Sequence, residues 1–334
     1  MDRIIDVNLN RASEALRTIE EIARFYLDNG DLSEKLKLIR HNLSVVADKH
    51  YSDLLQSRNT QDDVGTIIAN PTEKRDITDV YKAGFKRLQQ SLRVLSEFAQ
   101  ANGIEANMFE GARYESYTLE KIMFEELSKK IKKERIKNKK LYLVTSSMPS
   151  QDEFLDRVAL ALKGGVQIVQ LREKAAPAKD IIELGIKLRE LCSLYDALFI
   201  VNDRVDIAKI TCADGVHLGQ DDIEIKQARK ILGDEAIIGV STHSPDQAKE
   251  AMDSGADYIG VGPVFETPTK PGKKAVGLEY VKWASQNADI PWFAIGGINS
   301  ENLSEVLNAG VSSVAVVRAI MNAENPEIEA KNFL

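Results

Sequence analysis

Five consecutive residues, Gln170-Leu171-Arg172-Glu173-Lys174, place phosphate-binding residue types at the end of an apolar run. The preceding residues 166–169 read Val-Gln-Ile-Val, a pattern typical of a buried β-strand. Because strand side chains alternate between two faces, Arg172 and Lys174 point to the same side and can bind one anion. A phosphate or pyrophosphate fits best, since guanidinium and ammonium groups are strong donors to its oxygens. The alternative is a solvated loop that carries two charges, and the residues downstream decide between the two.

Two aspartates further along the chain could hold a metal ion beside these cations. Asp203 and Asp222 each follow a short apolar run. Carboxylates from neighbouring strands can share one Mg²⁺, which prefers oxygen ligands and commonly bridges to substrate phosphates. Taken singly, each aspartate is better explained as a helix N-cap. The pair beside Arg172, Lys174 and Lys270 favours a magnesium-bound pyrophosphate instead.

A glycine pair indicates a second phosphate site. Gly296 and Gly297 follow the apolar run 291–295, and without side chains they let the backbone approach a phosphate closely. A tight turn that needs positive φ explains the same pair and is compatible with that role. The sequence therefore predicts a site for two molecules: a pyrophosphate with its metal ion, and a monophosphate held by backbone amides.

The elements that must position these residues are short strands that alternate with helices. The predicted strands are 141–145, 166–171, 197–202, 214–218, 236–240, 257–261, 291–295 and 313–317. Helical patterns fill the gaps, for example at 152–163, 179–195, 245–254 and 300–309. Eight strand–helix units in about 195 residues predict a (β/α)8 TIM barrel with its active site at the carboxyl ends of the strands. A doubly wound open sheet is disfavoured, because no Gly-x-Gly-x-x-Gly motif follows the first strand.

Two histidines and two cysteines are left outside the predicted site. His217 and His243 could act as general bases, but packing or hydrogen bonding explains His217 at least as well. Nothing else in the pattern demands an acid–base pair, so neither histidine is assigned a catalytic role. Cys192 and Cys212 have no metal-ligand spacing and are interpreted as apolar fillers.

Taken together, the strand-end motifs resemble those of thiamin phosphate synthases across about residues 139–325. The resemblance rests on Gln170 to Lys174, Asn202-Asp203, Gly219 to Asp222, Ser241, Thr267-Pro268-Thr269-Lys270 and Gly296-Gly297-Ile298. It implies a Mg²⁺-dependent joining of hydroxymethylpyrimidine pyrophosphate to hydroxyethylthiazole phosphate, with release of pyrophosphate.

The same resemblance implies roles for individual residues. Catalysis is assigned to Arg172, Lys174, Ser241 and Lys270, and the metal ion to Asp203 and Asp222. The pyrimidine pyrophosphate is assigned to Gln170, Leu171, Arg172, Glu173, Lys174, Asn202, Ser241 and Lys270. The thiazole phosphate is assigned to Thr267, Pro268, Thr269, Gly297, Val317 and Arg318. The family often has serine where Arg318 stands, so a backbone contact would survive here and a hydroxyl contact would not.

Two other functions stay open for this part of the chain. A thiazole tautomerase-like relative would share the barrel but would not need the pyrophosphate and metal groups. Intact Arg172, Lys174, Asp203, Asp222 and Lys270 argue against it. A regulatory protein that binds the same phosphorylated molecules without chemistry is the other alternative, and formation of thiamin phosphate would exclude both.

The chain ahead of the barrel predicts a smaller all-α domain over residues 1–136, with the barrel domain at 137–334. Apolar residues at helical spacing predict a helix over 2–28, and further helices are expected at about 32–57 and 107–136. The lysine-rich stretch 128–140 is interpreted as a charged helix end that leads into a linker.

One face of the first helix carries polar residues at helical spacing: Asn8, Arg11, Glu14, Arg17 and Glu21. Segment 11–21 is weakly repeated at 87–97, where Arg93 matches Arg17. Two such helices facing each other would form a charged cleft inside a bundle, whereas the alternative is a row of ion pairs on the surface. A loop with Arg58, Asp62 and Asp63 adds the residue types that bind phosphate and Mg²⁺.

This first part, over about residues 1–125, resembles the hydroxymethylpyrimidine phosphate kinase domain that precedes some thiamin phosphate synthases. The resemblance rests on Asp6-Val-Asn8-Leu-Asn10-Arg11, Glu14-Ala-Leu-Arg17, Glu20-Glu21 and Asp63-Val64-Gly65-Thr66. It implies ATP as co-substrate for phosphorylation of a pyrimidine monophosphate. Residue chemistry alone selects the candidates Asn8, Arg11, Glu14, Arg17, Glu21, Asp62, Asp63 and Arg93. The alternative is a non-catalytic dimerisation or regulatory module.

Composition narrows the class of protein. The 334 residues are 43% hydrophobic and 28% charged, as in ordinary globular proteins. A net charge of −7 argues against a nucleic-acid binder, which is usually basic. No signal-peptide pattern and no apolar run near the ~20 residues of a membrane span occur. We therefore expect a cytoplasmic enzyme that acts on small phosphorylated molecules, with no nucleic-acid or membrane partner; a homo-oligomer is left open.

Overall fold

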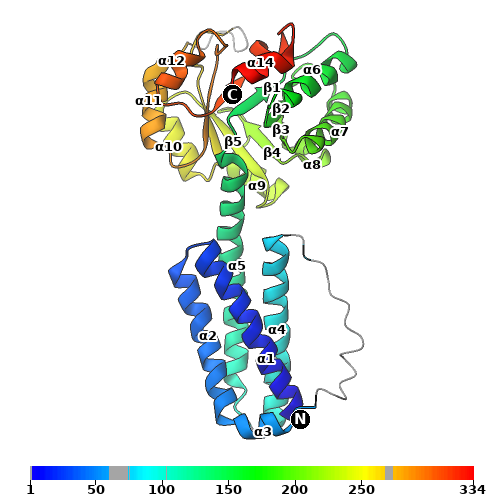
Figure 1. Ribbon diagram of the computed structural model, residues 1–334, viewed down its shortest axis with the longest axis vertical. Helices are drawn as coiled ribbons and strands as arrows, with labels where there is room; N and C mark the ends of the chain where they lie inside the picture. The colour runs from blue at the N-terminus through cyan, green and yellow to red at the C-terminus, as the bar shows by residue number, and fades with distance from the viewer. Residues whose placement is uncertain (1, 60–73, 75, 103, 268–273) are drawn as a thin grey trace. The chain divides into compact units, whose positions relative to one another are not determined.

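The computed structural model describes residues 2–59, 74, 76–102, 104–267 and 274–334 (Figure 1). They form two compact units, Met1–Lys130 and Ile131–Leu334, and the division falls inside one long helix. The last turns of that helix therefore belong to the second unit. Among the described residues, no helix is both long and apolar enough to cross a membrane.

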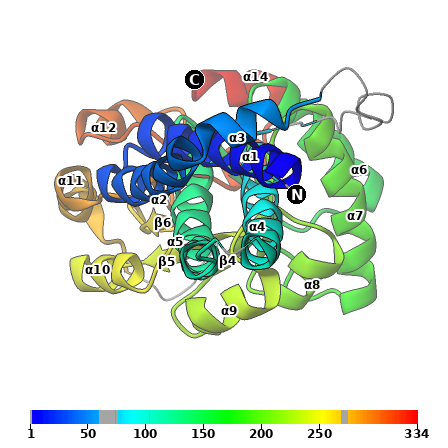
Figure 2. The same cartoon turned by 90° about the horizontal axis from the view of Figure 1, so that it is seen from below.

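The first unit is a bundle of long helices (Figures 1 and 2). Its elements are α1 (Asp2–Glu21), the π-helix η1 (Ile22–Tyr26), α2 (Gly30–Lys49), α3 (Tyr51–Gln56), α4 (Ile77–Ala101) and α5 (Asn107–Lys137). The helices predicted at 2–28 and 107–136 are confirmed. The one predicted at 32–57 is two helices, because the α2 geometry ends at His50.

The α1–α4 contact in this bundle is apolar. Leu16 and Ile19 of α1 and Phe85 and Leu88 of α4 are fully buried. A Cβ at Gly84 would lie 2.9 Å from Cγ1 of Ile19, so this glycine lets the two helices pack closely. The repeated segments therefore meet through their apolar stripes.

The matched arginines of the repeated segments do not face each other across the two helices. Arg17 pairs with Glu21 at 2.9 Å, and Arg93 pairs with Glu97 at 2.8 Å, each within its own helix. All four side chains are at least half exposed. Such i,i+4 pairs on a wet surface contribute only about 0.3–0.5 kcal/mol, so the matched arginines follow the surface alternative.

The second unit is a closed barrel in which each strand pairs in parallel with the next and β8 pairs with β1. The strands are β1 (Leu141–Val144), β2 (Ile168–Leu171), β3 (Leu198–Asn202), β4 (Gly215–Leu218), β5 (Ile237–Thr242), β6 (Tyr258–Val261), β7 (Trp292–Ile295) and β8 (Val314–Val316). The helices around them are α6 (Gln151–Lys163), α7 (Ala178–Leu194), α8 (Val205–Ile210), α9 (Ile225–Leu232), α10 (Pro245–Asp253), α11 (Gly277–Asn287), α12 (Leu303–Asn308), α13 (Arg318–Met321) and α14 (Pro326–Asn332). The predicted (β/α)8 barrel is confirmed.

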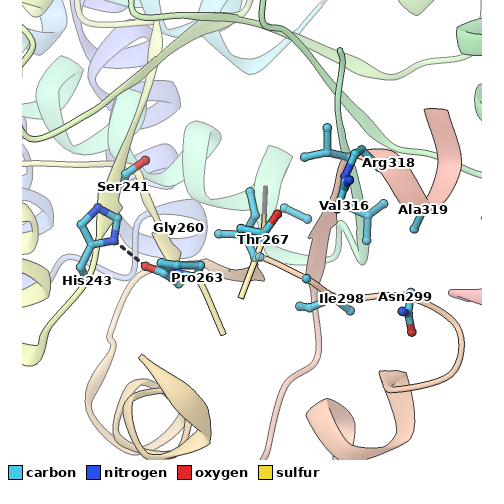
Figure 3. Close-up of a pocket in the computed structure, with 16 residues that line it drawn as sticks. Ser241, His243, Gly260, Pro263, Thr267, Ile298, Asn299, Val316, Arg318 and Ala319 are labelled. Atoms are coloured by element: carbon cyan, nitrogen blue, oxygen red, sulfur yellow. Dashed lines mark hydrogen bonds between the residues drawn. The ribbon is translucent and has the colours of Figure 1, made fainter. Parts of the chain in front are cut away.

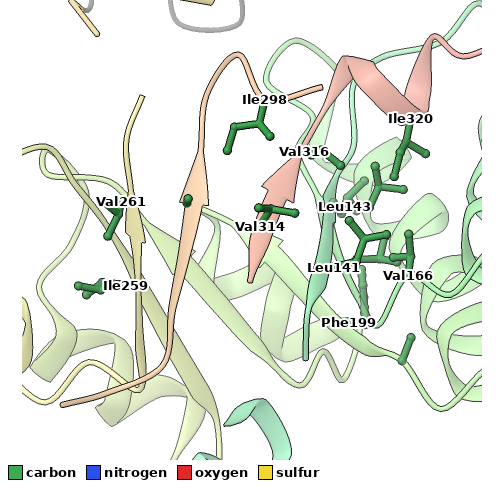
Figure 4. Close-up of a cluster of buried hydrophobic side chains, with 14 of the residues drawn as sticks. Leu141, Leu143, Val166, Phe199, Ile259, Val261, Ile298, Val314, Val316 and Ile320 are labelled. Atoms are coloured by element: carbon green, nitrogen blue, oxygen red, sulfur yellow. The ribbon is translucent and has the colours of Figure 1, made fainter. Parts of the chain in front are cut away.

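Alternation along the strands separates two cores. Leu141 and Leu143 of β1 point outward into the apolar layer between strands and helices (Figure 4). Tyr142 of the same strand points inward and packs with Tyr258 and Phe293 inside the barrel. The interior is therefore filled by side chains, and the room for a ligand lies at its mouth.

The last turns of α5 cover the amino ends of the strands. Ile136 is 1% exposed and packs in the interior cluster. Lys132 pairs at 3.1 Å with Asp257, which directly precedes β6, and Arg135 pairs at 2.5 Å with Asp214, which directly precedes β4. The lysine-rich stretch is thus helical to Lys137 and contacts the barrel, which leaves the carboxyl ends of the strands for chemistry.

Candidate functional site

Two cavities lie at the carboxyl ends of the barrel strands. The larger encloses about 270 Å³ and the smaller about 60 Å³. Their linings share Ser241, Gly260, Ile295, Ala315 and Val317, so the cavities adjoin each other. Most of the residues predicted to bind the two phosphorylated molecules are found around one or the other.

The larger cavity is bordered by the segments that follow β6, β7 and β8. Thr267, Gly297, Val317 and Arg318, all predicted for the thiazole phosphate, line it. Figure 3 shows Ser241 and His243 on one side of the cavity and Arg318 on the other. Its described lining contains this one guanidinium and no carboxylate, so the cavity favours an anion.

The glycine pair after β7 is required by the backbone. Gly296 has φ +104° and Gly297 has φ +68°, which is the left-handed region. A Cβ at Gly296 would lie 2.5 Å from Cα of Pro263, and one at Gly297 would lie 2.7 Å from Cβ of Phe265. The pair therefore allows the turn after β7 to pack directly against the segment after β6.

The smaller cavity is lined by Gln170, Arg172, Asn202 and Ser241, all predicted for the pyrimidine pyrophosphate. Gln170 is buried, and its Nε2 donates to the hydroxyl of Tyr142 at 2.6 Å. Gln170 and Arg172 lie two positions apart at the end of β2, so both reach the same space.

Two residues of the same motif do not face this cavity with their side chains. Leu171 is buried in the outer layer between strands and helices. The carboxylate of Glu173 accepts hydrogen bonds from Oγ of Ser147 at 2.7 Å and from the amide of Ala175 at 3.1 Å. Partial burial raises the pKa of Glu173, but these hydrogen bonds outweigh it and hold the pKa below its usual range. Glu173 thus orders the loop after β2.

The predicted metal ligands come together. Asp203 has φ +58°, and its carboxylate lies 3.2 Å from Nζ of Lys174. Asp222 accepts a hydrogen bond from the amide of Gly219 at 2.7 Å. Burial around its carboxyl raises the pKa of Asp222, and the adjacent carboxylate of Asp203 raises it further. Two carboxylates that repel each other in this way fit a divalent cation.

Mg²⁺ would need ligands beyond these two carboxylates. In the part of the chain that the structure describes, no group of three or more metal-ligating side chains occurs. Mg²⁺ commonly keeps several waters and binds substrate phosphates, so two carboxylates beside Lys174 suit a metal that arrives with a pyrophosphate.

Several predicted residues lie outside the described residues: Pro268, Thr269 and Lys270 of the barrel, and Asp62 and Asp63 of the helical unit. Among the others in the helical unit, Asn8 is buried and its Nδ2 donates to the carbonyl of Ile4 at 2.8 Å. Arg11 and Glu14 are exposed.

The helical unit has a shallow groove of about 570 Å³ where α1 passes into η1. Arg17 and Glu21 line it, together with Phe25. Two acidic side chains that are not among the candidates predicted for the helical unit are buried and paired with arginines. Asp6 receives two hydrogen bonds from Arg58 at 2.8 and 2.9 Å, and Glu20 pairs with Arg40 at 2.9 Å.

The sequence alone did not predict a row of hydrogen-bonded polar side chains inside the barrel. Tyr142, Tyr258 and His217 point inward and contact Gln170 and Ser241 at its two ends. A signal existed, because Tyr142 stands at an inward position of its strand, where apolar residues are usual.

Comparison with known proteins agrees with this geometry. The family described as "Thiamine monophosphate synthase" matches residues 141–320, and the "ThiD2 family" matches residues 3–122. A thiamine-phosphate synthase of Synechocystis sp. is 47% identical over 327 residues, which is 97% of this chain and 92% of that protein. One of Nostoc punctiforme is 45% identical over 335 residues, covering 99% of this chain and 93% of that protein.

A solved structure gives the same result for the barrel. The thiamine phosphate pyrophosphorylase of Pyrococcus furiosus is 41% identical, with a TM-score of 0.54, and the match covers 60% of this chain and 95% of that one. The family match spans most of the barrel, and the two relatives match nearly the whole chain. The chain therefore belongs to the thiamine-phosphate synthase family, transferases of thiamin biosynthesis.

Proposed function

We propose that the barrel joins hydroxymethylpyrimidine pyrophosphate to hydroxyethylthiazole phosphate and releases pyrophosphate. One observation carries the proposal: the two adjoining cavities meet at Ser241. The smaller has Arg172 in its lining, and Lys174 and the paired aspartates follow the neighbouring strands. The larger is anion-favouring and bordered by the glycine pair. A site with two anion-binding ends and a shared wall suits the joining of two phosphorylated molecules.

In this reaction the bond between the pyrimidine methylene and the pyrophosphate oxygen breaks, and its electrons leave with the pyrophosphate. Arg172 and Lys174 compensate the charge that builds on the leaving group. Mg²⁺, held by Asp203 and Asp222, would supply further charge compensation when bound. The electron-rich aminopyrimidine stabilises the methylene cation left behind.

The thiazole nitrogen then donates its lone pair to the methylene carbon and forms the new C–N bond. The larger cavity holds the thiazole by its phosphate, so the nitrogen is oriented toward the wall at Ser241. Positioning and charge compensation provide the rate, and no side chain has to act as a nucleophile.

The direct test uses the full chain with both substrates and Mg²⁺, and thiamin phosphate and pyrophosphate are measured together. Equal amounts of the two products are expected, and omission of either substrate should abolish both. Binding of both substrates without product would instead support the regulatory alternative. Thiazole isomerisation without pyrophosphate release would support the tautomerase-like one.

We propose a second activity for the helical unit: ATP-dependent phosphorylation of hydroxymethylpyrimidine phosphate. It is supported by the ThiD2-family match over residues 3–122 and by the groove that Arg17 and Glu21 line. The product would be the pyrophosphate that the barrel consumes, so one chain would catalyse consecutive steps.

The kinase test uses the full chain carrying Asp203→Ala, so that the barrel does not drain the product. ADP formation should depend on the pyrimidine monophosphate and should fall with Arg17→Ala. Arg93→Ala is the matched control, since Arg93 forms a similar surface pair outside the groove. A folded chain that leaves ATP untouched would favour the dimerisation or regulatory module.

A further inference from the structure

A continuous row of hydrogen bonds crosses the barrel interior along the wall of the smaller cavity. Nε2 of Gln170 lies 2.6 Å from the Tyr142 hydroxyl, which lies 2.9 Å from the Tyr258 hydroxyl. The Tyr258 hydroxyl lies 3.0 Å from Nδ1 of His217, and Nε2 of His217 lies 2.9 Å from Oγ of Ser241. All five residues of the row line the smaller cavity, with Gln170 and Ser241 at its two ends.

The interior is built to hold this row in place. Tyr142 and Tyr258 are each 1% exposed, and their rings contact Phe293 edge-on. A Cβ at Gly239 would lie 2.0 Å from Cζ of Tyr258, so the neighbouring strand needs a glycine to admit this ring. The ring of Tyr258 is therefore held in a close-fitting space, with its hydroxyl between Tyr142 and His217.

The donor in each hydrogen bond of the row can be inferred from the Gln170 amide, which can only donate through its nitrogen. The Gln170 amide donates to Tyr142, so the Tyr142 hydroxyl has its own hydrogen left to donate to Tyr258, its other neighbour in the row. If Tyr258 in turn donates to Nδ1 of His217, the ring hydrogen of His217 is on Nε2, which then donates to Ser241. Burial raises the pKa of both tyrosines, so both hydroxyls keep their hydrogens at neutral pH.

We propose that Tyr142, Tyr258 and His217 are positioning residues that hold Ser241 as a hydrogen-bond donor toward the pyrimidine substrate. Oγ of Ser241 accepts from His217, so its own hydrogen is directed to an acceptor in the cavity. The lone pair of a pyrimidine ring nitrogen is the acceptor that such a donor recognises. This inference rests on the proposed barrel function, because it names how one of its substrates is oriented.

The first test measures the row without turnover. The full chain is labelled with ¹⁵N-histidine, and His217 is assigned among the four histidines by its loss in His217→Gln. We expect ¹⁵N shifts of the tautomer with hydrogen on Nε2, and we expect Tyr258→Phe to change that pattern. Hydrogen on Nδ1 in the unaltered chain would reverse the row, make Ser241 a donor to His217, and overturn the proposal.

The second test measures the Kd of Mg²⁺–hydroxymethylpyrimidine pyrophosphate by calorimetry, so it needs no activity. Tyr258→Phe should weaken binding about tenfold, the size of one lost hydrogen bond. In a Ser241→Ala background the same change should weaken it by less than about twofold, because Tyr258 acts through Ser241. The Kd of the thiazole phosphate should stay within about twofold in Tyr258→Phe, because Tyr258 does not line the larger cavity.

Tyr280→Phe is the matched control, since its buried hydroxyl donates to Thr242 at 2.6 Å outside the row. It should leave both Kd values within about twofold. An equal loss from Tyr258→Phe with and without Ser241 would mean that the tyrosine is merely structural, and the proposal would fail. Absence of thiamin phosphate formation by the unaltered chain would refute the proposed function instead, whatever the tautomer of His217.

Discussion

Substitution of Gly297 by alanine tests whether the shape of the larger cavity determines binding of the thiazole phosphate. Gly297 has φ +68°, and its backbone lies in the cavity wall. An added Cβ would lie 2.7 Å from Cβ of Phe265 and 2.9 Å from the carbonyl oxygen of Glu266. Both neighbours belong to the segment after β6, so the turn after β7 has to move away from it.

The expected magnitude has two parts. A non-glycine residue in the left-handed region costs about 1–2 kcal/mol, and overpacking of a close contact costs about 1–3 kcal/mol. The chain can relieve part of this total by shifting the turn, which would weaken the proposed contacts with the thiazole phosphate. If about 1.4–2.8 kcal/mol appears as lost binding, the KM for the thiazole phosphate rises about 10- to 100-fold. The KM for the pyrimidine pyrophosphate should change by less than about threefold.

The assay measures initial rates of thiamin phosphate formation with each substrate varied in turn, and thermal unfolding of each variant. Gly255→Ala is the matched control, because Gly255 has φ +88° but nothing within 4 Å of its added Cβ, and it precedes β6 at the opposite end of the barrel. It should destabilise the fold and leave both KM values near those of the unaltered chain. The reasoning is refuted if Gly297→Ala keeps its KM for the thiazole phosphate, or if both variants raise it equally.

Three further outcomes follow from other contacts. Asp203→Ala should lower kcat/KM at limiting Mg²⁺ by more than about 100-fold, since even supporting partners of metal ligands contribute about 10–100-fold; near-normal activity would contradict the metal assignment. Asp257→Ala should reduce the free energy of unfolding of the barrel by about 3–5 kcal/mol in urea titrations, because it leaves Lys132 and Arg229 without their shared carboxylate; a loss below about 1 kcal/mol would contradict this. Burial raises the pKa of Asp214, but a backbone amide and two arginines outweigh it and hold that pKa below its usual range. The stability it contributes is therefore present at neutral pH and lost as pH falls below about 4, and Asp214→Asn should flatten that loss in pH-dependent unfolding.

The barrel was predictable because short apolar runs, the predicted strands, alternate regularly with helical patterns along the chain. Each predicted strand overlaps an observed one, and residues such as Arg172 and Asp203 stand directly after a strand, where a parallel barrel gathers its ligands. Residue type and position after a strand were then enough to predict that Thr267, Gly297 and Arg318 lie around one cavity. These features depend on local pattern and on the common direction of the strands.

What could not be predicted depends on partners far apart in the chain. Charges at helical spacing did not distinguish Arg17, which pairs on the surface, from Glu20, which is buried against Arg40. The face that is buried is decided by the other helices. In the barrel, Tyr142 and Tyr258 are 116 positions apart, and only closure of the barrel brings their hydroxyls together. The spacing of residues within one strand therefore cannot predict this contact.

His217 contacts both halves of the proposed pyrimidine site, through its backbone and through its ring. Its backbone carbonyl accepts the amide hydrogen of Asp203 at 2.9 Å and so supports the left-handed conformation that turns this carboxylate toward Lys174. Its ring bonds Oγ of Ser241. A non-glycine residue in that conformation is strained by about 1–3 kcal/mol and persists only where surrounding contacts fix it. A substitution of the His217 side chain keeps the first contact and removes the second. The carboxylate of Asp203 and the hydroxyl of Ser241 can therefore be perturbed independently, although one residue supports both.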